Sequence, residues 1–305
     1  MQQAAVDLDL AVLDSAVEAA IVAGRPEGLR VLGYGEITLV LGWPAHAPTT
    51  AVKRLPVFPD RGRLDAYADL LARYTAELRA RGVGVVDTEL RSVAGPGGSV
   101  HAYLIQPYVP RDRHLEAHLR DGDPARTPDL LAELVDAVVG CVGDRVGLDA
   151  QAANWAVGEA GIECFDVSTP MLRGQDGREE LDLSIFLSVY PPAMRPALAR
   201  IAPGVMAQYH DARTVLLDVA SNLHKDGLHR LLATFLDAAN ARLERPLTEA
   251  DVMHYFRQDK LLWALLQRLR LADRMWQRRV RRRPYPFLLP ARYRYGPPRH
   301  ERQTR

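Results

Sequence analysis

The chain has 305 residues, of which 48% are apolar and 25% are charged, so the composition is that of an ordinary globular protein with a sizeable core. The length fits one two-lobed domain or two small ones, and the net charge of +1 points to no class of partner for the whole chain. No uninterrupted apolar run reaches the roughly 18 residues of a membrane span, and no basic segment precedes an apolar run as in a signal peptide.

The first third of the chain begins with a helix and continues into strands. Residues 6–23 carry apolar side chains at helical spacing, and this pattern ends near Gly24. Residues 29–41 predict two strands broken by glycines in Gly33-Tyr34-Gly35. Residues 49–55 predict a third strand, which carries a lysine.

A second helix and a hairpin are expected next. Residues 62–81 predict a helix because these apolar side chains recur on one face: Leu64, Tyr67, Leu71, Tyr74 and Leu78. Residues 83–93 and 101–105 predict a hairpin joined by a glycine-rich turn. Prolines at 107 and 110 end that run, and the change in composition at 106–111 predicts a boundary between two lobes.

The remainder of the chain is predicted to be mainly helical. Residues 128–142 form an apolar helix, and two short strand pieces, 155–157 and 162–165, follow a turn-rich segment. Helices fill most of 193–283, and the last of them begins at a capping box made by Thr248 and Asp251.

These elements predict an α+β fold. Residues 1–106 would form a small, mainly β N-lobe with an N-terminal helix and an antiparallel sheet. Residues 107–283 would form a larger helical C-lobe, and residues 284–305 a basic tail rich in proline and aromatic residues.

Two features of the predicted N-lobe suit a phosphate group. Glycines such as Gly33 and Gly35 let the backbone approach phosphate oxygens closely, although a lone Gly-x-Gly is often only a turn. Lys53 lies in an apolar strand of a chain whose 39 basic residues include only three lysines. An ammonium held in this way can neutralise phosphate charge and pair with a carboxylate on a neighbouring helix.

Two carboxylates and an amide follow in the predicted C-lobe. Asp149 and Asn154 are separated by four residues in a turn-rich segment, and Asp166 ends a short apolar strand twelve residues further on. In this order, after a glycine turn and a strand lysine, the chain resembles the protein-kinase-like superfamily, and in particular its aminoglycoside, choline and fructosamine kinase branch. The pieces Asn154-Trp155 and Asp166–Pro170 and the ending Pro284–Pro290 also resemble an uncharacterised actinobacterial-type family of this kind.

The resemblance covers residues 29–170 and implies a two-lobed kinase-like fold that binds ATP and Mg²⁺. By resemblance, Lys53 holds phosphate oxygens, Asn154 and Asp166 hold the magnesium ion, and Asp149 orients the hydroxyl that attacks. Backbone groups of Gln106 and Tyr108, at the boundary between the lobes, would meet the adenine. The helix partner of Lys53 would be Asp69 or, as the alternative, Glu77.

The chain departs from the kinase pattern in three places. Gly147-Leu148 stands where His-Arg or His-Gly usually precedes the catalytic aspartate, the third glycine of the phosphate loop is absent, and Val167-Ser168 follows Asp166 in place of Phe-Gly. We therefore expect a Mg-ATP-dependent phosphotransferase that acts on a small hydroxylated metabolite, with a pseudokinase, a nucleotide-binding module without turnover, as the alternative. The acceptor, and whether phosphate or the nucleotide is transferred, stay open.

The C-terminus is strongly basic. Residues 268–305 hold 13 arginines against two acidic residues, and the densest piece is Arg278–Arg283. Such a segment can bind nucleic acid or an acidic surface, which gives a third hypothesis for function. We favour the other interpretation, that these arginines pair with acidic patches of the same chain.

The cysteines indicate a reducing compartment. Cys141 and Cys164 lie in apolar surroundings without Cys-x-x-Cys spacing, so we expect buried free thiols. Together with the lack of a signal peptide, this predicts a cytoplasmic protein with no transmembrane segment.

Overall fold

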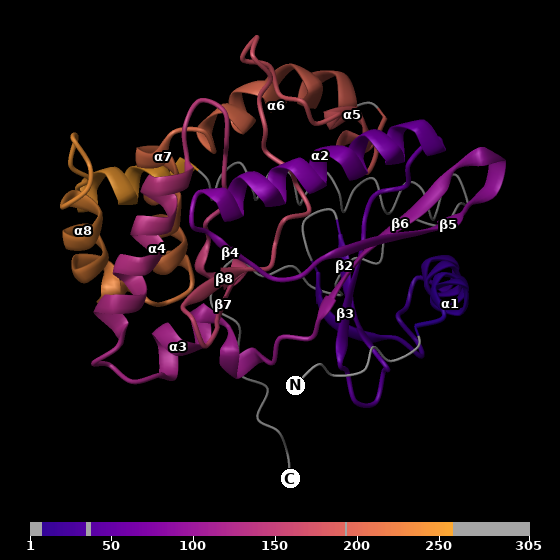
Figure 1. The fold of residues 1–305 in the computed structure, drawn as a ribbon, viewed down its shortest axis with the longest axis horizontal. Coiled ribbons are helices and arrows are strands. Elements are labelled where there is room, and N and C mark those ends of the chain that lie inside the picture. Colours follow the sequence, from indigo (N-terminus) through magenta and orange to yellow (C-terminus); the bar gives the residue numbers. More distant parts are fainter. Residues whose placement is uncertain (1–7, 35–37, 193, 259–305) are drawn as a thin grey trace.

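The structure is a computed structural model that describes residues 8–34, 38–192 and 194–258. It is an α+β fold in which an antiparallel sheet and a group of helices lie side by side (Figure 1). The predicted mixture of strands in the first third and helices afterwards is confirmed.

The main sheet has five strands in the order β1-β2-β3-β6-β5, and all of its neighbouring strands are antiparallel. The bounds of its strands are β1 Arg30–Tyr34, β2 Leu39–Trp43, β3 Thr50–Arg54, β5 Glu89–Ala94 and β6 Val100–Pro107. The hairpin expected before the lobe boundary is β5 and β6, but only residues 89–93 of its predicted first strand, 83–93, belong to β5, because residues 84–85 pair in a second sheet. β6 lies between β5 and the lysine-bearing strand β3.

One face of this sheet is covered by helix α1, Leu10–Ala23 (Figure 1). Asp9 caps its N-terminus by accepting hydrogen bonds from Ala11 N and Val12 N, and Gly24, at φ 69°, ends it in the left-handed region. The helix buries its apolar stripe against Leu41 and Val52 of the sheet. The helix therefore starts four residues after the start of the predicted range and ends where predicted.

The other face is covered by helix α2, Arg61–Ala80. Its buried side chains are those of the predicted face together with one further leucine: Leu64, Tyr67, Leu70, Leu71, Tyr74 and Leu78. Because side chains alternate along a strand, Ala102 and Leu104 of β6 face α2, whereas Tyr103 faces α1.

The helical part follows β6. Its helices are α3 Leu115–Asp121, α4 Thr127–Cys141, α5 Leu183–Leu187, α6 Arg195–Gln208, α7 Ala212–Lys225 and α8 Leu232–Asn240. Residues 249–258 are helical as well, and the capping box is confirmed: Thr248 N donates to Asp251 Oδ2 at 3.0 Å, and Asp251 N donates to Thr248 Oγ1 at 3.2 Å. The short helices α3 and α5 were not expected from the sequence.

A small second sheet joins the two parts. Its strands are β4 Gly84–Val85, β7 Trp155–Val157 and β8 Ile162–Cys164, in the order β4-β8-β7. β4 comes directly after α2 and pairs with β8 in parallel. This pairing brings the end of the first third of the chain beside the segment that leads to Asp166.

The buried apolar residues form two clusters. The smaller cluster lies between α1 and the sheet, and the larger one runs from the α2 face of the sheet through α4, α7 and α8. Both cysteines are buried and free in the larger cluster, as predicted. That cluster contains residues on both sides of position 106, so the core continues across the predicted lobe boundary.

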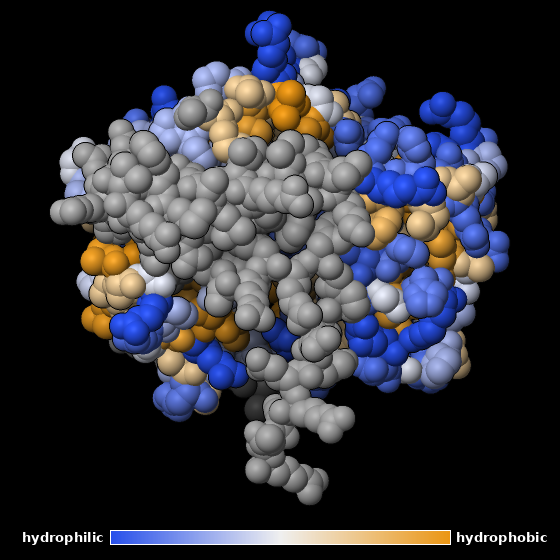
Figure 2. All heavy atoms as spheres, turned by 180° about the vertical axis from the view of Figure 1, so that it is seen from behind, coloured by the Kyte–Doolittle hydropathy of each residue, from blue (hydrophilic) through white to orange (hydrophobic). Residues whose placement is uncertain are grey.

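Some large apolar side chains of the described residues remain exposed, and apolar residues lie among hydrophilic ones on the surface (Figure 2). On α6 they are Ile201 and Val205, and on α1 they are Val12 and Val22. No helix in the described ranges is long and apolar enough to cross a membrane. The predicted tail 284–305, the basic piece Arg278–Arg283 that precedes it and most of the predicted last helix lie outside the described residues.

Candidate functional site

Lys53 and Asp166 form the centre of the candidate site. Lys53 lies on β3 and is 9% exposed, and Asp166 lies two residues beyond the end of β8. Lys53 Nζ donates to Asp166 Oδ1 at 2.6 Å although 113 positions separate the two residues. The ammonium can reach Asp166 because Lys53 extends from the α2 side of the sheet, where the larger core and β8 lie.

The two carboxylate oxygens of Asp166 differ in their surroundings. Oδ1 accepts hydrogen bonds from Lys53 Nζ, from Ser168 Oγ at 2.8 Å and from Ser168 N at 3.2 Å. No described residue donates to Oδ2, and the Asp166 side chain is 31% exposed. Burial disfavours the charged form of Asp166, but Lys53 and Ser168 outweigh it and hold the pKa of this carboxyl below its usual value.

The carboxyl group of Asp149 lies close enough to Asp166 to interact with its charge. Burial, and then the negative charge of Asp166, raise the pKa of Asp149 to about 6, while hydrogen bonds from Gln151 N and Asn154 and the charge of Lys53 act in the opposite direction. The described hydrogen bond to its carboxylate is a long one, 3.4 Å from Gln151 N to Oδ1. A carboxyl with a pKa near neutrality in a polar cluster is a candidate for acid–base chemistry.

Asn154 links the two aspartates. Its Nδ2 donates to the main-chain oxygen of Asp149 at 3.2 Å, and its own main-chain oxygen accepts from Phe165 N at 3.0 Å. The turn from Asp149 to Asn154 is therefore closed on itself and tied to the residue before Asp166. Lys53, Asp149, Asn154 and Asp166, which the sequence predicted to form one site, are brought together.

The segment that leads into Asp149 is held from several sides. Gly147 N donates to Met171 O at 2.9 Å, Leu148 N donates to Tyr209 O at 3.1 Å, and the hydroxyl of Tyr74 donates to Gly147 O at 3.0 Å. A Cβ at position 147 would lie 3.0 Å from His210 Nε2, from Met171 Cβ and from Tyr209 O. A side chain here would be tightly packed, and its neighbours would have to move by a few tenths of an ångström.

The side chain of Gln106, on β6, stabilises the site through hydrogen bonds. Its Nε2 donates to Thr88 Oγ1 and to Phe165 O, both at 2.8 Å, so its buried side chain is fixed to the residue before Asp166. Tyr108 N donates to Thr49 O at 2.9 Å. That N–H is already paired, which removes it from the backbone groups expected to meet an adenine.

The glycine turn is described only in part. Gly33 lies on β1 at an irregularity in the pairing with β2, and a Cβ there would meet no atom of the described residues within 4 Å. Gly35 lies outside the described residues. As far as the described residues go, the backbone at Gly33 is open to the close approach that the sequence suggested.

The expected helix partner of Lys53 needs a correction. Asp69 lies on the exposed side of α2, and Glu77 pairs with Arg81 Nη1 one turn further along the same helix. The described partners of Lys53 are Asp166 Oδ1 and Ser168 Oγ. The prediction failed because the helical period directs tyrosines, and not carboxylates, towards the site.

Two residues of the site were not predicted. Ser168 Oγ lies 2.9 Å from Lys53 Nζ, and Tyr67 donates its hydroxyl hydrogen bond to Ser168 O at 3.0 Å. Burial and the charge of Asp166 raise the pKa of Tyr67, which keeps its hydroxyl protonated as a donor. Tyr67 was expected only as part of the apolar face of α2, and nothing in the sequence distinguished its hydroxyl.

The donor set at this site suits a hard divalent cation. Asp166 Oδ2 and Asn154 Oδ1 accept no described hydrogen bond, and Asp149 offers a further carboxylate. Mg²⁺ prefers oxygen ligands of this type and commonly takes one or two carboxylates together with phosphate oxygens and water. The residues present therefore fit magnesium, and the Lys53 ammonium beside them fits a phosphate group.

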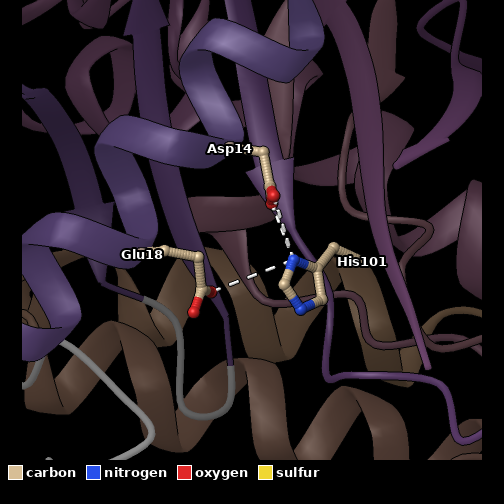
Figure 3. A group of neighbouring side chains, drawn as sticks. All are labelled: Asp14, Glu18 and His101. Carbon is tan, nitrogen blue, oxygen red and sulfur yellow. Dashed lines mark hydrogen bonds and ion pairs between the residues drawn. The ribbon is translucent and has the colours of Figure 1, made fainter. Parts of the chain in front are cut away.

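A second polar cluster lies between α1 and the sheet. Asp14 and Glu18 of α1 and His101 of β6 point towards one another, and their potential ligand atoms all lie within 4.8 Å (Figure 3). Asp14 Oδ1 accepts hydrogen bonds from Tyr103 OH at 2.6 Å and from His101 Nδ1 at 2.9 Å. The geometry could hold a metal ion, but the members already satisfy one another.

Arg54 completes this cluster. Its Nη2 donates to Glu18 Oε1, and its buried Nη1 has no described partner. A guanidinium in contact with Glu18 repels a second cation and compensates the charge of Glu18, while Tyr103 and His101 hydrogen-bond to Asp14. We therefore interpret the cluster as the polar attachment of α1 to the sheet.

Comparison with known proteins gives one family. A family model described as a family of unknown function, DUF6206, matches residues 12–274. No curated protein matches the chain.

Proposed function

We propose that this chain, which belongs to the DUF6206 family, is a Mg-ATP-dependent phosphotransferase that acts on a small hydroxylated metabolite. The proposal draws on the resemblance of residues 29–170 to the protein-kinase-like superfamily, because the family assignment itself carries no activity. It includes a two-lobed kinase-like arrangement of the α+β fold.

The observation that carries the proposal is the bond between Lys53 Nζ and Asp166 Oδ1, 2.6 Å long and spanning 113 positions. A phosphate-binding lysine on the third strand and a metal-binding aspartate must lie next to the same triphosphate in a kinase-like site. Other ion pairs of this chain also join distant residues, such as Arg73 and Glu180, but the pair of Lys53 and Asp166 is more buried and its charges act on Asp149.

The proposed division of work follows from the charges. Lys53 would bind phosphate oxygens, and Asn154 Oδ1 and Asp166 Oδ2 would hold the magnesium ion. When bound, the ion neutralises charge on the phosphates and helps to orient them. Since Asp166 Oδ1 is already engaged by Lys53 and Ser168, the metal would use the opposite oxygen without breaking that contact.

Asp149 would accept or orient the proton of the acceptor hydroxyl. Its pKa of about 6 leaves it ionised at neutral pH, and it still has a higher proton affinity than an ordinary aspartate. The oxygen of the acceptor would then attack the terminal phosphorus as the bond to the leaving nucleotide diphosphate breaks. Positioning and charge neutralisation would supply most of the rate enhancement.

A pseudokinase is the second candidate, and one observation favours it. No described carboxylate of α2 reaches Lys53. A module of this kind would bind nucleotide to stabilise one conformation and would not turn it over.

Titration calorimetry with ATP, with and without Mg²⁺, tests the proposal on wild type, Lys53→Ala and Asp166→Ala. We expect Mg²⁺-dependent binding in wild type and its loss in both variants, while Asp69→Ala, which alters an exposed residue of α2, binds as wild type does. Binding that ignores both Mg²⁺ and Lys53→Ala would refute the proposed site.

Turnover separates the two candidates. ATP hydrolysis or transfer to a panel of hydroxylated metabolites should be lost in Asp149→Asn while nucleotide binding is kept. Nucleotide binding by wild type without turnover on any acceptor would favour the pseudokinase.

A further inference from the structure

Ser168 connects three parts of the candidate site through one buried residue that is 5% exposed. Its hydroxyl lies 2.9 Å from Lys53 Nζ and donates to Asp166 Oδ1 at 2.8 Å. Its main-chain N–H donates to the same carboxylate oxygen at 3.2 Å. The ammonium, the carboxylate and the hydroxyl therefore form a closed triangle.

The main-chain oxygen of Ser168 faces helix α2. The hydroxyl of Tyr67, a residue 3% exposed, donates to it at 3.0 Å. Tyr67 also packs against Phe58 and Phe186, with ring centroids 5.3 Å and 6.3 Å apart, so its ring has little freedom to move. Tyr67 thus fixes the position of Ser168 relative to α2.

Among the described contacts, no other side chain of α2 is linked to Lys53 through a hydrogen bond or an ion pair. The carboxylates expected on this helix lie elsewhere, Asp69 on the exposed side and Glu77 against Arg81. A buried lysine needs its three N–H donors satisfied, and the described acceptors are Asp166 Oδ1 and Ser168 Oγ.

We infer that Ser168 is a positioning residue that couples α2 to the phosphate-binding lysine. This inference deepens the proposed function and rests on it. Tyr67 holds the main chain of Ser168, and the Ser168 hydroxyl holds Lys53 against Asp166 Oδ1, which leaves Oδ2 directed to the metal site. A displacement of α2 therefore reaches Lys53 through Ser168 and not through a helix carboxylate.

The test measures the reactivity of Lys53 without nucleotide. The chain has only three lysines, so acylation of Lys53 by an amine-reactive ester can be followed by mass spectrometry against Lys225 in the same sample. In Ser168→Ala the ammonium loses one charge-assisted hydrogen bond, and we expect Lys53 to react about tenfold faster relative to Lys225. Ser168→Thr keeps a hydroxyl and should restore the rate to within about threefold of wild type.

Tyr67→Phe provides a second variant, which leaves the residue at position 168 unchanged and removes only the hydrogen bond to its main-chain oxygen. It should raise the rate of Lys53 acylation by about threefold, because it frees the main chain but keeps the hydroxyl. The Kd for Mg-ATP should rise in parallel, by about tenfold in Ser168→Ala. Circular dichroism confirms that each variant is folded at the temperature of labelling.

The outcomes separate the two proposals. If folded Ser168→Ala and Tyr67→Phe label Lys53 at the wild-type rate, Ser168 does not position Lys53 and the inference is overturned. If labelling changes as expected but wild type binds no Mg-ATP, the coupling stands and the proposed nucleotide function fails. If labelling changes but the Kd for Mg-ATP does not, Ser168 has only a structural role.

Discussion

Lys53 Nζ lies 2.6 Å from Asp166 Oδ1 although the two residues come from different parts of the fold. Lys53 lies on β3 of the five-stranded sheet, and Asp166 lies in the segment that follows β8 of the small sheet. The contact depends on α2, which packs on the sheet and leads directly into β4, the parallel partner of β8. The same helix supplies Tyr67 to Ser168 and Tyr74 to Gly147, so it supports both halves of the candidate site.

Replacing Lys53 by methionine should destabilise the protein. Asp166 would keep the hydrogen bonds from Ser168 but lose its cation, and we expect a loss of about 1–3 kcal/mol, below the usual cost of a fully buried pair because the Asp166 side chain is 31% exposed. Urea unfolding at pH 7 measures this loss of stability. Arg61→Met, which removes an exposed ion pair with Asp65, should change stability by less than about 0.5 kcal/mol.

The effect of Lys53→Met should also depend on pH. Since the folded state lowers the pKa of Asp166, the stability that this carboxylate contributes is present above its ordinary pKa and is lost as the pH falls below about 4. The difference between wild type and variant should therefore shrink in acid. An equal difference at pH 7 and at pH 3 would contradict the ion pair.

Asp149→Asn should stabilise the protein at neutral pH. The folded state raises the pKa of Asp149 to about 6, so folding binds a proton between about pH 4 and pH 6, and the wild type loses stability as the pH rises through this window. The asparagine avoids this cost, and we expect a gain of about 1–3 kcal/mol at pH 7 and almost none at pH 4. Thermal unfolding at the two pH values provides the measurement. A variant less stable than wild type at pH 7 would show that the charge of Asp149 does not destabilise the folded state.

The dependence of ATP binding on Mg²⁺ should require Asn154. Mg-ATP at a hundredfold excess over its Kd should raise the free energy of unfolding by about 2.7 kcal/mol in wild type. Asn154→Ala removes the free amide oxygen, and Mg²⁺ should then add little to the effect of ATP alone. Gln151→Ala, in the same turn but offering only a main-chain donor to Asp149, should keep the response to Mg²⁺.

Gly147→Ala should be destabilising, and Gly143→Ala is its matched control. The new methyl group at position 147 would press on His210 Nε2, Met171 Cβ and Tyr209 O at 3.0 Å, whereas a Cβ at Gly143 would meet no described atom within 4 Å. Overpacking of this kind costs about 1–3 kcal/mol, and the control should be neutral or more stable by up to about 1 kcal/mol. Urea unfolding of both variants measures the change in stability. Similar free energies of unfolding for the two variants would contradict the explanation by close packing around Gly147.

The cluster on α1 can be tested through its acceptor. Asp14→Ala removes the acceptor of the Tyr103 hydroxyl in a buried site and leaves His101 Nδ1 with only Glu18 Oε1, at 3.9 Å, so we expect a loss of about 2–4 kcal/mol. Ser15→Ala on the exposed side of the same helix should cost less than about 0.5 kcal/mol. A chelator should leave the melting temperature of wild type unchanged, and a drop in that temperature would indicate a bound metal at Asp14, Glu18 and His101.

The order of elements and most of their positions could be predicted from the sequence. Apolar periodicity located α1, α2 and α4, and glycine and proline located the turns between strands. These signals are local, because each depends on residues within one helical turn or one hairpin. The spacing of Asp149, Asn154 and Asp166 and the rarity of lysine also identified the residues that meet at the site.

The partners of Lys53 depended on tertiary structure. A sequence shows that Asp69 and Glu77 are charged and lie on a helix, but not which side of that helix faces the lysine. The apolar stripe of α2 must face the core, so packing leaves Asp69 exposed, leaves Glu77 half-buried against Arg81, and brings the Tyr67 hydroxyl to Ser168. Hydrogen bonds between residues a hundred positions apart form only when two packed surfaces bring them together, and for this reason the sequence alone predicted the members of the site but not the contacts among them.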